Sequence, residues 1–170
     1  DPEDKLAACI RSACAIGGSR DFDQDPRFGV LVLAEIASRA LSPGINDPGT
    51  AIDMITRITQ LLAFWARGET EAEPVRYPHV HVPRLETGDL FEDAFAAIAR
   101  DGAGIIEVQI RLQKALAALM AMGDDDFRDA ARQQARLAFG HASAALRLEQ
   151  EVARLRDLLP WLEEPQHADT

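Results

Sequence analysis

Three aspartates alternate in one loop of this 170-residue chain, and alternating carboxylates are the opening ligands of calcium-binding loops. They are Asp21, Asp23 and Asp25. The complete pattern needs glycine at its sixth position and glutamate at its twelfth, where this sequence has Pro26 and Val32. Acids are also common at helix starts, because they complement the partial positive charge there. We therefore predict a helix entry and no calcium site.

Two histidines, His79 and His81, would point to the same face of an extended segment and could supply two ligands to a transition metal. A site needs further ligands, and His141 and the cysteines lie at no recognised metal-binding spacing from this pair. We expect surface or interface histidines, no metal and no cofactor. The spacing of Cys9 and Cys14 in a helical pattern favours two buried, reduced thiols.

Two acid–base pairs occur in apolar helical segments, Glu35 with Arg39 and Asp53 with Arg57. Each pair has the acid four residues before the base, which is the favourable order on a helix. If the two helices form a hairpin, the four charges could make a partly buried network that fixes their register, since a buried charge is costly unless paired. The alternative is a ligand pocket lined by Arg39 and Arg57. The structural network is the preferred hypothesis.

The segment between these pairs contains a helix stop, a corner and a helix start. Ser42-Pro43-Gly44 cannot continue a helix, and Gly44 tolerates a positive φ. Asp47 can cap the next helix, with Pro48 at its first position. A helix start near Ser42 and Asn46 could hold an anion, but the Asp47 carboxylate already satisfies those donors and repels phosphate. The candidate ligand residues are therefore weak ones: Glu35, Arg39, Ser42, Asn46, Asp53 and Arg57.

Composition limits the function classes. The chain has 28 Asp and Glu against 18 Lys and Arg, a formal charge of −10, which disfavours a nucleic-acid partner. No nucleophile elbow, phosphate-binding loop, dinucleotide-binding glycine pattern or zinc-protease motif occurs, so we lean against an enzyme. No apolar run is long enough to span a bilayer.

Helical periodicity dominates the chain, so we predict an all-α fold, a compact bundle of about six helices in a single domain over residues 1–170. A short extended arm is expected around Val75-Val82. The helix to Leu41 is apolar nearly all round, which predicts a central position. The spacing of Asp89 and Glu92 predicts a capping pair at the start of a later helix. The expected helices are approximately 1–16, 26–41, 48–67, 89–101, 104–123 and 127–159, the last capped by Asp124-Asp125-Asp126.

Apolar residues of the third helix are expected to face inward: Ile52, Ile55, Ile58, Leu61, Leu62 and Trp65. In the last helix a second set repeats three and four apart, as in a coiled-coil seam: Ala145, Leu148, Val152, Leu155, Leu159 and Leu162. The seam predicts a homo-oligomer, although packing onto the chain's own core is a serious rival. Arg128, Arg132 and Arg136 stack on the same helix, and a solvated face is the default interpretation, with membrane headgroups as the alternative.

The segment from Arg20 to Ala51 also resembles a known family, through Gln24-Asp25-Pro26-Arg27-Phe28-Gly29, Arg39-Ala40-Leu41-Ser42-Pro43-Gly44 and Asn46-Asp47-Pro48. It is similar to the C-terminal region of a bacterial predicted-membrane-protein family, domain-of-unknown-function family 2254. The resemblance implies a parent protein embedded in the bacterial inner membrane, with this domain on the cytoplasmic side. The chain starts at Asp1-Pro2 without a methionine, as we would expect of a fragment.

The leading functional hypothesis is a soluble, non-catalytic domain of that membrane protein, serving oligomerisation or partner contacts. The alternative is a small anionic-ligand-binding or enzymatic domain that uses Arg39, Arg57 and the corner from Ser42 to Asn46.

Overall fold

The structure is a computed structural model that describes residues 2–13, 18, 20–22, 25–68, 79, 81 and 85–163. All regular secondary structure in these residues is helical, which confirms the predicted all-α fold. The helices are α1 (Pro2–Ala13), α2 (Pro26–Ala40), α3 (Pro48–Ala66), α4 (Thr87–Asp101), α5 (Ile106–Met120), α6 (Asp125–Ala145) and α7 (Glu149–Arg156), followed by the 3-10 turn η1 (Pro160–Glu163).

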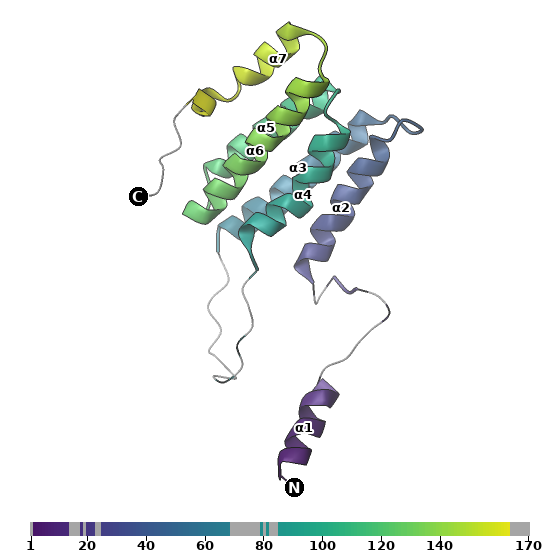
Figure 1. The fold of residues 1–170 in the computed structure, drawn as a ribbon, viewed down its shortest axis with the longest axis vertical. Coiled ribbons are helices and arrows are strands. Elements are labelled where there is room, and N and C mark those ends of the chain that lie inside the picture. Colours follow the sequence, from purple (N-terminus) through teal and green to yellow (C-terminus); the bar gives the residue numbers. More distant parts are fainter. Residues whose placement is uncertain are drawn as a thin grey trace.

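Five of these helices form a two-layer bundle, with α2, α4 and α6 in one layer and α3 and α5 behind them (Figure 1). Helices α2 and α4 run parallel. Side-chain hydrogen bonds connect the start of α2 with the start of α4 and the end of α2 with the end of α4. Arg27 donates to Asp93 at the start, and Ser38 donates to Asp101 at the end. Helices α2 and α3 form the predicted antiparallel hairpin.

Local capping explains where three of the helices begin. Asp25, Asp47 and Asp124 each accept a hydrogen bond from the backbone N–H three residues later, at 3.0–3.1 Å. An N-cap carboxylate satisfies one of the donors that the first helical turn leaves free. Pro26 and Pro48 follow two of these caps at the first helical position, where a missing N–H costs nothing.

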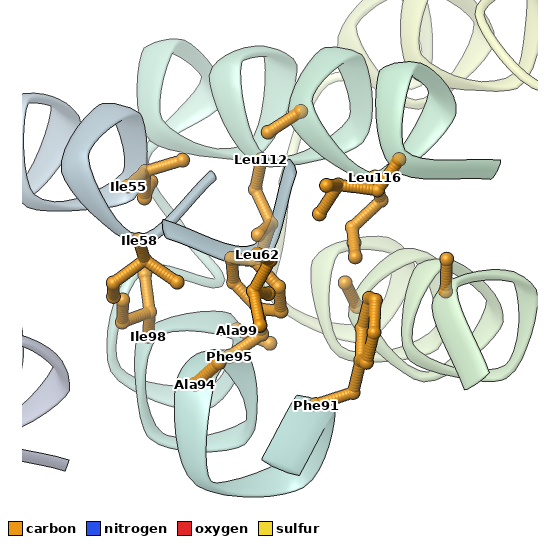
Figure 2. Close-up of a cluster of buried hydrophobic side chains, with 14 of the residues drawn as sticks. Ile55, Ile58, Leu62, Phe91, Ala94, Phe95, Ile98, Ala99, Leu112 and Leu116 are labelled. Carbon is orange, nitrogen blue, oxygen red and sulfur yellow. The ribbon is translucent and has the colours of Figure 1, made fainter. Parts of the chain in front are cut away.

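The centre of the bundle lies around α4 and not around α2, so the predicted central position of α2 is wrong. Phe91 and Phe95 of α4 are fully buried, whereas Ile36 of α2 is exposed. Figure 2 shows the side chains of α4 meeting those of α3 and α5. Helix α2 is at one side of its layer, so part of its nearly continuous apolar surface stays open to solvent. The labelled core residues are Ile55, Ile58, Leu62, Phe91, Ala94, Phe95, Ile98, Ala99, Leu112 and Leu116.

Alanines let α6 approach its neighbours closely. Ala131, Ala135, Ala138 and Ala142 are completely buried on one face of this helix. The buried Gln113 of α5 donates from Nε2 to the carbonyl oxygen of Ala135 at 3.0 Å, which ties the two backbones together. Helices with small contact residues pack with short axial separations, so the alanine-rich sequence accounts for the close α5–α6 pair.

The predicted start of the fourth helix differs from the structure. Helix α4 starts at Thr87, so Asp89 and Glu92 are not its capping pair, and Glu86 precedes it without a side-chain cap. Asp89 instead accepts from Arg27 at 2.9 Å. Leu85 precedes this start and is partly buried against the core, so tertiary packing favours an earlier start than the local sequence indicates.

The long C-terminal helix predicted from periodicity is broken at 146–148, and not at Gly140. Leu146 is extended, with φ −71° and ψ 134°, and α7 then turns back along the bundle. This turn buries Leu155 and Leu159, whereas Leu148 is exposed. The six residues therefore form no continuous coiled-coil seam, and burial of Leu155 and Leu159 in the chain's own fold explains their spacing.

Helix α1 stands away from the bundle (Figure 1). Its apolar residues Leu6 and Ile10 are 62% and 57% exposed, and Cys9 is an exposed free thiol, so the predicted burial of Cys9 is wrong. Cys14 lies outside the described residues. The same holds for the extended arm predicted around Val75-Val82, apart from His79 and His81, which are exposed.

Candidate functional site

The corner between α2 and α3 is built mainly by backbone and capping interactions. Asp47 accepts from the N–H of Thr50 at 3.0 Å and from its hydroxyl at 2.6 Å. These bonds, the hydroxyl first, lower the pKa of Asp47 below its ordinary value, because they stabilise the ionised form. The predicted cap is confirmed. The donors at the start of α3 are engaged by this carboxylate, which leaves an anion little to bind there.

Asn46 has a backbone role in this corner. It adopts the left-handed conformation with φ 49°, which asparagine tolerates better than most residues, whereas the sequence had suggested Gly44 for such a position. The N–H of Asp47 then donates to the carbonyl oxygen of Ala40 at 2.8 Å and closes the turn. Ser42 donates from its hydroxyl to the carbonyl oxygen of Arg39 at 2.7 Å. Both small polar residues are therefore explained by the turn itself.

A polar groove of about 580 Å³ lies beside this corner, and we define it by Glu35, Ser38, Arg39, Leu41, Ser42, Pro43 and Asp101. The structure thus brings three of the six candidates together, Glu35, Arg39 and Ser42. Sequence reasoning missed Ser38 and Asp101, which come from α2 and α4. They are 63 residues apart in the chain, so no local pattern signals their contact.

Asp101 is the most constrained side chain of the polar groove. It accepts from Arg100 Nε at 2.8 Å and from the hydroxyl of Ser38. The hydrogen bond from Arg100 lowers the pKa of Asp101, partial burial opposes this, and the bond from Ser38 adds to the lowering. Asp101 therefore remains ionised at neutral pH and acts as a fixed acceptor, which is unsuited to donating a proton.

The predicted four-charge network is not formed. Asp53 and Arg57 bind each other, with 2.9 Å between Arg57 Nε and Asp53 Oδ2, and both side chains are more than half exposed. Within the described part of the chain, Glu35 makes no ion pair with Arg39, and none connects either of them to Asp53 or Arg57. Asp53 and Arg57 therefore do not belong to the polar groove.

The charges of the polar groove argue against an anionic ligand. Glu35 and Asp101 place two carboxylates beside Arg39, and the groove lies where α2 and α4 end. Helix C-termini carry partial negative charge. A larger hollow of about 860 Å³ at the opposite end of the bundle is also acidic, since it is lined by Glu86, Asp124, Asp126 and Asp129 among others.

Sequence reasoning also missed a pair of ion pairs between α2 and α4, in which Arg27 binds both Asp89 and Asp93; we call it the Arg27 clamp. Arg27 binds Asp93 at 2.6 Å and Asp89 at 2.9 Å, and Asp93 is less exposed than either of the other two side chains. The hydrogen bond that Arg27 donates to Asp93 raises the pKa of Arg27, because it stabilises the charged guanidinium. Arg27 and Asp93 are 66 residues apart in the chain, and no local sequence pattern predicts a contact between residues so distant. The clamp fixes the parallel register of α2 and α4.

An apolar groove of about 490 Å³ lies close to this clamp, and we define it by Gly29, Val30, Leu61, Leu62, Trp65, Leu85 and Leu90. Leu61 is 48% exposed and Trp65 is also exposed, so the expectation that both face the core is wrong. Phe64, one position from Trp65, is 68% exposed. Exposed large apolar side chains that gather at one place on a surface commonly mark a contact site.

The three stacked arginines of α6 are not a simple solvated face. Arg128 pairs with Asp125, and Arg132 lies 4.0 Å from Asp129. The guanidinium groups of Arg132 and Arg136 lie 5.8 and 5.7 Å from the centre of the Trp161 ring in η1. These cation–π contacts attach the C-terminal turn to α6.

No three histidine, cysteine, aspartate or glutamate side chains gather in a metal-binding arrangement among the residues that the structure describes. Asp23 is not among them, so the alternating aspartates cannot be compared as a set. In the described part of the chain, no helix is both long enough and apolar enough to cross a bilayer.

Comparison with known proteins identifies relatives of unknown function. The sequence profile of the family described as "Predicted membrane protein (DUF2254)" matches residues 1–118. Uncharacterized protein Rv1290c of Mycobacterium tuberculosis and uncharacterized protein Mb1321c of Mycobacterium bovis are each 45% identical to this chain over 51 residues. That match covers 30% of this chain and only 10% of each mycobacterial protein. No solved structure matches the chain.

Proposed function

Because this chain belongs to the DUF2254 family of predicted membrane proteins, we propose that it is a non-catalytic contact domain through which copies of its parent protein associate. The parent is embedded in the bacterial inner membrane in this proposal, and the domain lies on the cytoplasmic side. An exposed thiol at Cys9 suits a reducing compartment.

The apolar groove is the observation that supports this proposal best. Its lining comes from α2, α3, α4 and Leu85, which lies two residues before α4, and the Arg27 clamp fixes α2 and α4 in place relative to each other. Preformed apolar grooves of this kind receive the apolar face of an amphipathic helix from a partner. Leu61 and Trp65 at its edge offer the large side chains that contribute most to such contacts.

A ligand-binding or enzymatic role for the polar groove has less support. Its Asp101 is held by Ser38 and Arg100, and Ser42 is held by the carbonyl oxygen of Arg39. Arg57, which the alternative hypothesis needs, lies outside it. The remaining charges, Glu35 and Arg39, are of opposite sign, so the groove offers no concentrated positive field to an anion.

The proposal can be tested with a matched pair of substitutions in the full chain. Leu61→Asp places a charge on the apolar groove, whereas Leu137→Asp places one on α6 at a residue of nearly equal exposure, 50% against 48%. We expect Leu61→Asp to shift sedimentation velocity profiles toward the monomer and Leu137→Asp to leave them unchanged. If both variants are folded and their sedimentation profiles are the same, the apolar groove does not mediate self-association.

The membrane side can be tested separately. In intact cells, a membrane-impermeant maleimide should leave a Leu137→Cys variant of the parent protein, in a Cys9→Ser, Cys14→Ser background, unmodified. Permeabilised cells should show labelling, because Leu137 is exposed on α6 and lies outside the apolar groove. Labelling of this cysteine before permeabilisation would contradict the cytoplasmic placement.

A further inference from the structure

The chain carries two apolar surfaces without a partner among its described residues, the apolar groove and one face of α1. The face of α1 consists of Leu6, Cys9, Ile10 and Ala13, at the i, i+3, i+4 spacing of a helical stripe. All four are exposed. Helix α1 stands beyond the end of the bundle at which α2 begins (Figure 1), which is also the end where the apolar groove lies.

We propose that α1 of one copy seats its apolar face in the apolar groove of a second copy, and that the exchange is reciprocal. This inference rests on the proposed function and names the occupant of its groove. A helix of 12 residues is about 18 Å long and matches the helix-in-groove mode of recognition. Because the exchange is two-fold, each copy both donates α1 and receives it.

Residues Arg20 and Phe22, which precede α2 in the chain, are held against the start of that helix. Arg20 binds Asp25 at 2.8 Å, and the ring of Phe22 stacks on that of Phe28 with 4.8 Å between their centres. These contacts anchor the chain against the first turn of α2, next to Gly29 of the apolar groove. Helix α1 itself lies beyond this end of the bundle (Figure 1).

Reciprocity is needed because one α1 offers little surface. It presents only two large apolar side chains, and a stable interface between proteins buries about 1,200–2,000 Å² in total. Two exchanged helices double the contact and bring Leu61 and Trp65 of both copies under cover. The formal charges of α1 also balance, with Glu3 and Asp4 against Lys5 and Arg11, so the arm itself adds no repulsion between two acidic chains.

Two substitutions on the apolar face of α1 test the inference without disturbing the bundle. Leu6→Asp with Ile10→Asp changes side chains that are already exposed, and Ala8→Asp places a charge on the opposite face of the same helix. In sedimentation experiments we expect the double variant to associate at least tenfold more weakly than the wild type, and Ala8→Asp to associate as the wild type does. At a concentration low enough for all three to be monomeric, their thermal unfolding should be the same, because association itself would raise the melting temperature.

Disulfide trapping identifies which copy provides the helix. In a Cys14→Ser background, Cys9 of α1 is paired with a new cysteine in Leu61→Cys, and Leu137→Cys serves as the matched control. Mild oxidation of Leu61→Cys should give a covalent dimer of twice the 18.6 kDa chain mass. The amount of this dimer should clearly exceed the amount formed by Cys14→Ser alone or by the Leu137→Cys control. A cross-link within one chain would overturn the exchange and assign α1 to its own groove.

The remaining outcomes separate the inference from the proposed function. If the wild type associates and the Leu6→Asp, Ile10→Asp variant associates equally well, the exchange is wrong and the contact domain stands. A monomeric wild type refutes both. A monomeric chain that floats with phosphatidylcholine vesicles through Leu6 and Ile10 would show that lipid, and not a second copy, receives α1.

Discussion

Gly102 lies where the end of α4 meets α2 and α5, and replacing it with alanine is a sharp test of that junction. An added Cβ would lie 2.7 Å from Val108 Cγ1, 3.0 Å from the carbonyl oxygen of Ile98 and 3.3 Å from Leu41 Cδ1. Val108 is completely buried and its branched side chain has little rotamer freedom on a helix. The Ile98 carbonyl is fixed as acceptor for the N–H of Gly102 at 2.9 Å. Neither neighbour has room to move away.

Overpacking of a close-packed core usually costs about 1–3 kcal/mol, and we expect a loss of this size in the free energy of unfolding for Gly102→Ala. Gly104→Ala is the matched control, because nothing lies within 4 Å of its Cβ position and the residue is exposed. Its stability should stay within about 0.5 kcal/mol of the wild type or rise slightly, since alanine restricts the unfolded chain. Urea denaturation followed by circular dichroism measures both. Equal unfolding free energies for the two variants would refute the tight junction.

Three further predictions concern the cap, the acid response and metals. Asp47→Ala should lower the urea midpoint of unfolding, because it removes the hydrogen bonds to Thr50, and self-association should persist. A variant that keeps its stability but no longer associates would show that the α2–α3 corner has a functional role. The lowered pKa values of Asp47 and Asp101 contribute stability that is present above the ordinary value of 3.8 and is lost as pH falls below it. Asp101→Asn should therefore flatten the decrease in melting temperature between pH 5 and pH 2, roughly the range in which such carboxylates become protonated. An unchanged profile would count against this role of Asp101. Elemental analysis of the purified chain should find no stoichiometric calcium or transition metal, and one equivalent that survives gel filtration would contradict this expectation.

Local chemistry made part of the fold predictable. The starts of α2, α3 and α6 follow from Asp25, Asp47 and Asp124, because capping depends on residues only three positions apart. The α2–α3 hairpin follows from the corner between them. Helical periodicity likewise identified the helices of the bundle before their arrangement was known.

The features that the sequence did not reveal depend on distant residues. Phe91 and Phe95 place α4 at the centre, yet the apolar surface of α2 is the more conspicuous in sequence. The break after Ala145 occurs without proline or glycine, because burial of Leu155 and Leu159 outweighs continued helical periodicity. The polar groove needs Ser38 beside Asp101, and the apolar groove needs Leu61 beside α2; neither contact has a local sequence signal.

The most direct test of the account is the mass of the unmodified chain in solution. Sedimentation equilibrium at several loading concentrations and at two salt concentrations should give an average mass that rises from 18.6 kDa toward twice that value. Added salt should strengthen the association, because each chain carries a formal charge of −10 and screening reduces their repulsion. A mass that stays at 18.6 kDa at every concentration and salt would contradict a contact domain that brings two copies together.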